Sequence, residues 1–323
     1  MKHSITLIAA ACATVFGAAP ALAQNYPDKP IRMIVPFPPG GSNDIVGRLV
    51  ANELTGRLGQ QVIVDNRGGA GGIIGSNLAA QARPDGYTLL IISVAFAYNP
   101  SIYKSRLQFD PAKSFTPVGI LGTGPNAFTV NPKLPVKSVK DVIALAKKQP
   151  GKINYATAGI GSFQHLSSEM FRIMSGVDIV HVPFKGGGPA MADVMAGNTE
   201  LCIGSLIQVI PHVRSGRLRA LATGGAKRAP ALADVPTMQE AGVAGYEANN
   251  WWGVLAPAGT PPAIVNRLNK EIAVVLAKPE IQKTFESQGA DTVTMGPAEF
   301  TRFINTETAK WAKVVQAANI KAQ

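Results

Sequence analysis

Two short glycine-containing turns are the most chemically informative parts of this 323-residue sequence. The first, Phe37–Asp44, follows the apolar segment Ile31–Val35, and the second, Thr157–His165, follows Lys152–Ala156. Each has the order of a strand, then glycines, then a serine that can cap a helix. Glycine lets a ligand approach the backbone, and a helix N-terminus offers unpaired N–H groups with a partial positive charge. Such turns are natural binding sites for a carboxylate or a phosphate.

Neither turn contains lysine or arginine, so an anion bound between them would be held mainly by backbone amides. A capping box would place Glu or Gln three residues after each serine and would cover an amide. Ile45 follows Ser42 at that spacing, and His165 follows Ser162. We therefore expect both helix starts to be partly open. The alternative is that both serines serve only as helix caps.

Candidate ligand contacts come from both turns and from residues expected to close the pocket. Asp44 is assigned an indirect role, holding a water molecule, since its carboxylate would repel a bound carboxylate directly. His165 is either a ligand contact or a capping residue, and Lys185 is either a cationic contact or part of a solvated loop. The candidate set is Phe37, Gly40, Gly41, Ser42, Asp44, Ser93, Phe96, Thr157, Ala158, Gly161, Ser162, Gln164, His165, Phe184 and Ser205.

The N-terminal segment has the pattern of a secretory signal peptide. Met1–His3 is basic, Ile5–Ala19 is apolar, and Ala21–Ala23 is a small-x-small cleavage site. We therefore expect an exported, periplasmic protein whose mature chain begins at Gln24. Of the 2 cysteines, only Cys202 lies beyond this segment, which leaves no internal disulfide and no cysteine metal site.

The formal net charge of +11 describes either a solvated basic surface or a field that attracts anions. Lysine and arginine are scattered rather than grouped with aromatic residues, so we expect no nucleic-acid partner. The sequence contains no P-loop, GxSxG or HExxH motif, and we expect neither a metal nor a cofactor. Gly69–Gly75 imitates a dinucleotide-binding turn, but the following strand, Thr88–Ser93, lacks a final acidic residue to bind a ribose. Close backbone packing is the expected role of these glycines.

Apolar runs alternate with helical patterns along the chain, which predicts an α/β fold with mainly parallel sheets flanked by helices. The length suggests two domains. Glycine-rich residues 119–126 and residues 249–259 look like connectors, which would give two lobes joined by a two-strand hinge. The predicted organisation is a signal peptide at 1–23, a first lobe formed by 24–123 and 249–323, and a second lobe formed by 124–248.

Several ordered motifs resemble the Bug family, the periplasmic solute receptors of tripartite tricarboxylate transporters. The matching segments are Tyr26–Arg32, Val35–Asp44, Asp65–Gly72, Pro84–Leu90, Tyr155–Gly159, His181–Ala190 and Leu255–Pro261. The resemblance covers essentially the whole chain after the signal segment. It implies a two-lobed periplasmic binding protein that closes on its ligand. It also implies that Phe37–Asp44 and Thr157–His165 hold a ligand carboxylate from opposite lobes, partly through ordered water.

Three functional hypotheses follow. The first is a monomeric receptor for a small carboxylate (a di- or tricarboxylate, an aromatic carboxylate or an acidic amino acid) that serves integral membrane transporter subunits. The second is an exported hydrolase that uses Ser162 or Ser42, although no orienting acid is evident and we expect no enzyme activity. The third is a sensor that binds the same ligand and docks to a signalling protein.

Overall fold

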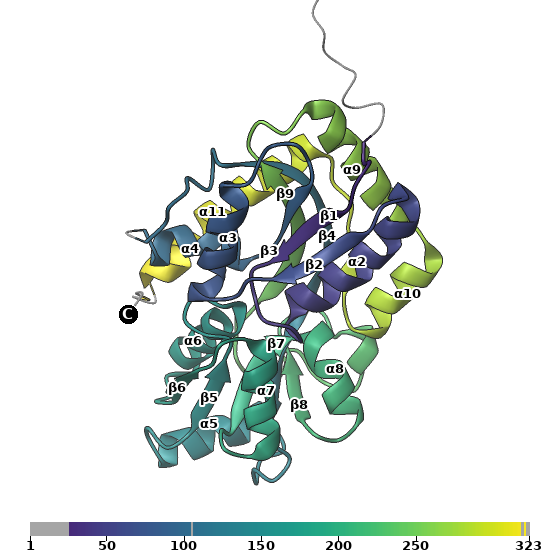
Figure 1. Ribbon diagram of the computed structural model, residues 1–323. Coiled ribbons are helices and arrows are strands. Elements are labelled where there is room, and N and C mark those ends of the chain that lie inside the picture. Colours follow the sequence, from purple (N-terminus) through teal and green to yellow (C-terminus); the bar gives the residue numbers. More distant parts are fainter. Residues whose placement is uncertain (1–25, 105, 318–319, 321–323) are drawn as a thin grey trace, which may run out of the picture.

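The computed structural model describes residues 26–104, 106–317 and 320. The predicted signal peptide, residues 1–23, lies outside the described residues. The chain forms two α/β lobes, one above the other in Figure 1, with the N-terminal strands and C-terminal helices together in the upper lobe. The predicted two-lobed α/β fold is confirmed. No helix in the described part of the chain is long and apolar enough to cross a membrane.

The first lobe is built around three parallel strands. β1 (Ile31–Val35) lies between β2 (Val62–Asn66) and β3 (Thr88–Ser93), and it pairs in parallel with both. Most side chains of β1 are buried, as expected for a strand covered by helices on both faces. The helices of this lobe are α2 (Ser42–Leu58), η1 (Ala70–Gly72), α3 (Ile73–Ala80), α4 (Ala95–Ile102), α9 (Pro262–Leu276), α10 (Pro279–Ser287) and α11 (Pro297–Ala317).

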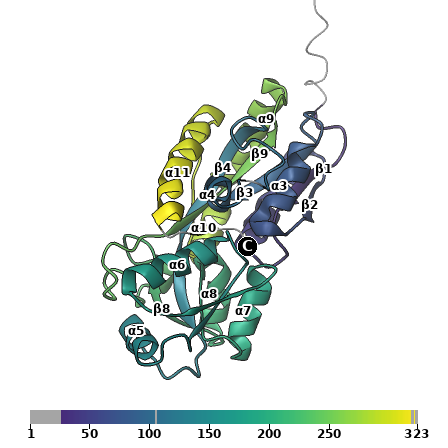
Figure 2. The ribbon, with the colours of Figure 1, turned by 90° about the vertical axis from the view of Figure 1, so that its left-hand side faces the viewer.

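The second lobe repeats this plan with a smaller sheet. β5 (Asn154–Thr157) pairs in parallel with β6 (Val180–Pro183) and β7 (Leu201–Ser205). The other elements are α5 (Val139–Lys148), α6 (Phe163–Ser175), α7 (Gly187–Ala196), α8 (Leu206–Arg214), β8 (Arg219–Thr223) and η2 (Pro230–Leu232). Figure 2 shows α5, α6, α7 and α8 grouped in this lobe, with α9 and α11 in the other.

One long strand joins the lobes. β4 (Phe115–Val130) pairs with β9 (Asn249–Pro257) as far as Pro125, and it pairs with β7 from Asn126 and with β8 from Ala127 onward. The glycine-rich segment at 119–126, which we expected to be one of two connectors forming a two-strand hinge, lies within this strand. Its glycines let other segments approach, since a Cβ atom on Gly119 would lie 2.8 Å from the side chain of Asn269. The short β10 (Asp291–Thr292) also pairs with β4.

The second crossing strand, β9, separates two cavities. Asn250 lines the cavity between the lobes, whereas its neighbour Asn249 lines another cavity together with Lys227 and Glu286. Successive residues of a strand point to opposite faces, so these two cavities lie on opposite sides of the hinge. We therefore expect a rotation that opens the first cavity to narrow the second.

Candidate ligand-binding site

The first lobe contributes the N-terminus of α2. Gly41 is the N-cap, with extended backbone angles (φ −82°, ψ 165°), and no side chain caps the helix. The interpretation of Ser42 as a simple cap is wrong, because its Oγ instead accepts hydrogen bonds from Asn250 Nδ2 and Trp252 Nε1, both at 3.3 Å. The amides of Gly41, Ser42 and Asn43 have no acceptor within the described residues. They are available to an anion.

The carboxylate of Asp44 holds the first turn, Phe37–Asp44, in place through hydrogen bonds. One carboxylate oxygen accepts a hydrogen bond from the Gly40 amide at 3.0 Å, and the other accepts from Arg48 and Asn66, both at 2.9 Å. Burial alone would raise the pKa of Asp44, but these hydrogen bonds outweigh burial and hold the pKa below its ordinary value. The Gly40 amide is therefore occupied, and the negative charge of Asp44 is already neutralised.

The second lobe contributes the N-terminus of α6. Ser162 caps this helix, since its Oγ accepts a hydrogen bond from the His165 amide at 3.2 Å. Gly161 has a left-handed backbone (φ +68°) that turns the chain into the helix. The amides of Phe163 and Gln164, the first two helical residues, have no acceptor in the part of the chain that the structure describes. This helix start is open, as predicted for both turns.

His165 supports the second turn from inside the lobe. Its Nδ1 accepts a hydrogen bond from the Gly161 amide at 3.4 Å, and its ring stacks on His181 at 4.3 Å between centroids. Burial lowers the pKa of His165, and burial lowers that of His181 to about 4, so both rings are neutral at pH 7. His165 reaches Ser162 through its backbone amide rather than its ring, so the pair lacks the geometry of a serine activated by a histidine.

Two further helices begin at the same place. α7 starts at Gly187, after β6, and α8 starts at Leu206, directly after β7. The carboxyl ends of parallel strands meet at one edge of a sheet, so the helices that follow β5, β6 and β7 begin close together. Gly187, Ser205 and Gln208 accordingly line the cavity with the residues of α2 and α6. The partial positive ends of four helices converge there.

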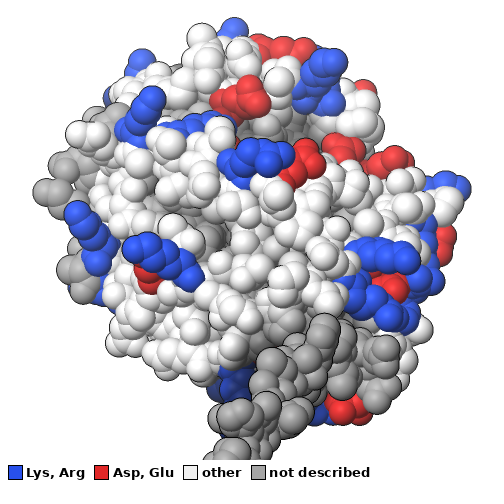
Figure 3. Space-filling view, turned by 90° about the horizontal axis from the view of Figure 1, so that it is seen from above, with Lys and Arg blue, Asp and Glu red and all other residues white. Residues whose placement is uncertain are grey.

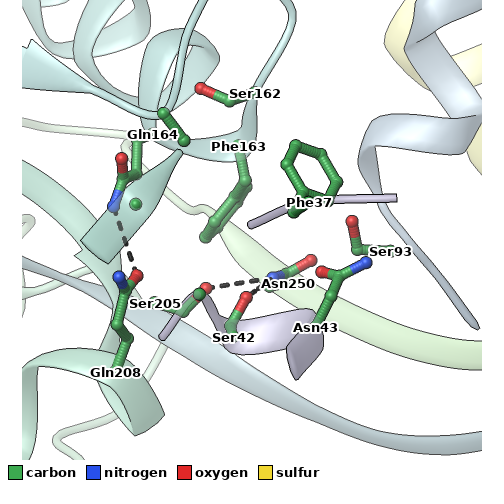
Figure 4. A pocket seen from close by; sticks show the side chains of 13 residues that line it. Phe37, Ser42, Asn43, Ser93, Ser162, Phe163, Gln164, Ser205, Gln208 and Asn250 are labelled. Atoms are coloured by element: carbon green, nitrogen blue, oxygen red, sulfur yellow. Dashed lines mark hydrogen bonds between the residues drawn. The ribbon is translucent and has the colours of Figure 1, made fainter. Parts of the chain in front are cut away.

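The cavity between the lobes is lined by uncharged side chains, many of them polar. It holds about 380 Å³ of empty space, open solvent included. Figure 4 shows serine, asparagine and glutamine side chains from both lobes around it, with Phe37 and Phe163 among them. Its lining consists of Phe37, Gly41, Ser42, Asn43, Ser93, Ala158, Ser162, Phe163, Gln164, Gly187, Ser205, Gln208 and Asn250. Among the described residues, therefore, no ionisable side chain lines it.

Two lining side chains carry buried atoms without a partner. Asn43 is 3 % exposed and Gln164 is 4 % exposed. Neither Asn43 Nδ2 nor Gln164 Oε1 has a hydrogen-bond partner within the described residues. An unsatisfied buried polar group costs about 1–3 kcal/mol. A ligand or water molecule in the cavity would remove this cost, and Asn43 Nδ2 specifically requires an acceptor.

Hydrogen bonds across the cleft show that the lobes are closed. Gln208 Nε2 donates to the Gly40 carbonyl at 3.1 Å, and Tyr103 Oη donates to the Ile160 carbonyl at 2.7 Å. At the hinge, Asn250 Nδ2 contacts Ser205 Oγ at 3.0 Å as well as Ser42 Oγ. Ser42, Ser205, Gln208 and Asn250 also line the cavity, so several of the bonds that hold the lobes together lie in its walls.

The predicted site residues occupy several different places. Those that line the cavity are Phe37, Gly41, Ser42, Ser93, Ala158, Ser162, Gln164 and Ser205. Those that belong to the turns without lining it are Gly40, Asp44, Thr157, Gly161 and His165. Phe184 lines an adjoining chamber. Phe96 lies elsewhere, stacked on Phe109 and edge-on to Phe115, because helix α4 turns it into the core of its lobe.

Five lining residues were missing from the sequence-based set, namely Asn43, Phe163, Gly187, Gln208 and Asn250. Asn43 and Phe163 follow the two serines directly, so their positions in the first helical turn were a usable signal. Gln208 lies in the first turn of α8, which directly follows β7. The sequence carried no comparable signal for Asn250, whose role depends on which face of the hinge strand it occupies.

A family profile described as "Tripartite tricarboxylate transporter family receptor" (TctC) matches residues 46–320 of this chain. The chain belongs to this receptor family. Protein BugT of Bordetella pertussis is 39% identical over 327 residues, covering 99% of each chain, and the predicted Bug-family membership is confirmed.

Two solved receptor structures are similar in both fold and sequence. R. palustris Rpa4515 with adipate has a TM-score of 0.89 and 37% identity, covering 92% of this chain and 99% of that one. MatC from Rhodopseudomonas palustris with bound malate has a TM-score of 0.85 and 30% identity, covering 90% and 100%. The family and its structural neighbours are solute-binding proteins rather than enzymes, and the family implies a periplasmic location.

Proposed function

We propose that this protein captures a small carboxylate between its lobes in the periplasm and delivers it to a tripartite tricarboxylate-type membrane transporter. The observation that carries the proposal is the convergence of four helix N-termini on a cavity lined, among the described residues, only by uncharged groups. Such a cavity stabilises an anion through amides and helix dipoles. The adipate and malate bound by two relatives support a carboxylate as that anion.

The available contacts are sufficient for tight binding. A hydrogen bond to a charged group contributes about 1.5–3 kcal/mol. A helix N-terminus adds about 0.3–1 kcal/mol, and up to ~2 kcal/mol when it is partly buried. The open amides at Gly41–Asn43 and Phe163–Gln164, together with Asn43 Nδ2, supply more than the four or five such contacts that would be needed. Together, these contacts supply the binding free energy of ~8 kcal/mol that a micromolar complex requires, after the cost of closing the lobes is subtracted.

The remaining parts of the proposal concern organisation and delivery. We retain lobe 1 as residues 24–123 and 249–323 and lobe 2 as residues 124–248. The change of strand partner at Pro125 and Asn126 on β4 supports a boundary close to the one expected. Closure changes the relative position of the lobe surfaces, so membrane subunits can distinguish the loaded receptor from the empty one. We propose that the receptor acts as a monomer.

A thermal-shift screen of the purified mature chain tests the receptor function. The panel contains malate, adipate, citrate, glutamate and benzoate, each over a range of concentrations. An acid present at ~100 times its dissociation constant should raise the free energy of unfolding by about 2.7 kcal/mol. If no acid in the panel raises the melting temperature, a carboxylate receptor is contradicted. Uptake of the labelled acid by cells with and without the gene then separates transport from sensing.

A further inference from the structure

A second, larger chamber adjoins the binding cavity. Phe37 and Ala158 line both spaces, so the two meet at these residues. The second chamber contains about 1240 Å³ of empty space, including solvent, against about 380 Å³ for the cavity itself. Its walls come from both lobes, with Tyr103 and Arg106 on one side and Phe184 and Lys185 on the other. We call it the outer chamber, because the Arg106 and Lys185 side chains are exposed to solvent.

The charges of the outer chamber differ from those of the inner cavity. Arg106 and Lys185 line it, and no Asp or Glu does so among the described residues. Neither cation forms a salt bridge within that part of the chain. Arg48 and Arg67, which lie close to the first turn, are by contrast paired with Asp44 and Asp65. The outer chamber therefore presents two uncompensated positive charges, one from each lobe.

The two cations also affect closure. Arg106 belongs to the first lobe and Lys185 to the second, so closing the cleft brings both positive charges to the same chamber. Both side chains are exposed to solvent, and an anion bound between them would be attracted from both lobes. A ligand with a second anionic group would therefore stabilise the closed form more than a ligand with one.

The walls between the inner cavity and the cations are mainly apolar. Phe37, Pro38, Ile160 and Phe184 contribute side chains without hydrogen-bonding groups. A ligand that extends from the helix N-termini towards the cations is thus expected to have an apolar middle, since polar groups there would lose water without gaining partners.

We infer that this receptor selects dicarboxylates whose two carboxylates are separated by an apolar chain or ring. One carboxylate lies at the four helix N-termini, and the other lies between Arg106 and Lys185. The inference rests on the proposed function and adds the identity of the ligand's second end. A compact acid such as malate fills only the inner cavity and leaves the two cations to solvent.

Calorimetric titration with matched acids tests this assignment. The series is malate, succinate, glutarate, adipate, pimelate and suberate, and each dicarboxylate longer than succinate is compared with the monocarboxylate of equal chain length, as adipate is with hexanoate. We expect one longer dicarboxylate to bind at least tenfold more tightly than both its monocarboxylate and malate. The advantage should shrink between 20 and 500 mM NaCl, because the outer contact is exposed and screened by salt.

Variants identify the residues responsible. In an Arg106→Gln, Lys185→Gln double variant, the dicarboxylate should bind no more than twofold more tightly than the monocarboxylate, and the monocarboxylate should bind as it does to the wild type. Lys104→Gln is the matched control, since Lys104 is exposed on the same segment but does not line the chamber. The Lys104→Gln variant should prefer the dicarboxylate to the monocarboxylate by the same factor as the wild type.

Two outcomes would overturn the inference. If malate or a monocarboxylate binds as tightly as every longer dicarboxylate, the receptor function stands and the assignment of the second end is wrong. If the double variant keeps the full dicarboxylate preference, Arg106 and Lys185 do not bind the second carboxylate. Failure of every acid in the series to bind would instead contradict the proposed function itself.

Discussion

Replacing Asn43 by aspartate places a negative charge at the helix N-termini without changing the size of the side chain. Asn43 is the second residue of α2, lines the cavity, and has a buried Nδ2 without an acceptor among the described residues. Aspartate is favourable in the first turn of a helix, so Asn43→Asp is expected to fold. The new carboxylate would occupy the place of a hydrogen-bond donor to the ligand.

The size of the effect follows from Coulomb's law. A ligand oxygen within hydrogen-bonding reach of Asn43 brings two negative charges to about 4 Å, which costs roughly 4 kcal/mol at an effective dielectric constant of ~20. Since every 1.4 kcal/mol is tenfold in affinity, Asn43→Asp should raise the dissociation constant about 1,000-fold. Loss of the Nδ2 donor adds to this effect.

Calorimetry with the acid that gives the largest thermal shift measures the change. Asn52→Asp is the control, because Asn52 lies on the same helix but is exposed and does not line the cavity. It has the same change in net charge and should bind within twofold of the wild type. If Asn43→Asp also binds within a few-fold of the wild type, the ligand's negative charge is not located at α2 and the reasoning is refuted.

Further predictions concern closure, the turn, acid stability and the hinge. Tyr103→Phe removes the hydrogen bond to the Ile160 carbonyl and should weaken binding about 2- to 10-fold, without shifting the melting temperature of the ligand-free protein if the free form is open; unchanged affinity would show that this bond does not contribute to closure. Gly161→Val places a Cβ 2.7 Å from the Tyr103 ring at a left-handed backbone position, so both affinity and melting temperature should fall; a variant with wild-type affinity would argue against a tight closed turn. Because burial keeps His165 and His181 neutral in the fold with lowered pKa values, the unfolded chain takes up protons first as the pH falls below the ordinary pKa of about 6.5, and stability should be lost progressively towards pH 4. Urea unfolding at pH 5 and 7.5 measures this loss, and His181→Gln should reduce it; equal pH dependence in the variant would assign the loss to other groups. Lys227→Glu places a third negative charge beside Glu286 and Asp291 in the cavity on the other side of the hinge, which we expect to narrow when the cleft opens, so ligand affinity should rise modestly; a fall in affinity would contradict the hinge geometry.

Charged side chains outside the ligand-binding site are distributed more evenly. Basic and acidic side chains are interspersed on the end of the molecule seen in Figure 3. On that face the net positive charge is therefore a distributed feature of the surface. The uncompensated cations of the outer chamber differ from this surface because no acid lines the same chamber among the described residues.

Local sequence patterns predicted the two lobes and the two open turns because both depend on neighbouring residues. The run before Phe37 forms β1 and the run before Thr157 forms most of β5, and each turn leads into a helix at the expected place. Residues 119–126 contain three glycines and were expected to be one crossing of a two-strand hinge; most of them form the part of β4 that pairs with β9. Prediction was poorer where distant packing decides which residues meet.

The site was predicted in part for the same reason. The convergence of α7 and α8 with α2 depends on how the two lobes meet, which no local pattern encodes. Asp44 and His165 were correctly associated with the turns, although both contact the backbone behind them rather than the cavity. Phe96 was misassigned because α4, where an apolar run is broken by Pro100, was not recognised as a helix.

A crystal structure of the mature protein with its tightest-binding dicarboxylate tests the central claim most directly. We expect one carboxylate within 3.2 Å of open amides from both α2 and α6, the normal range for hydrogen bonds, with no lysine or arginine in contact with it. A ligand whose carboxylates contact only Arg106 and Lys185, with water alone at the helix N-termini, would contradict it.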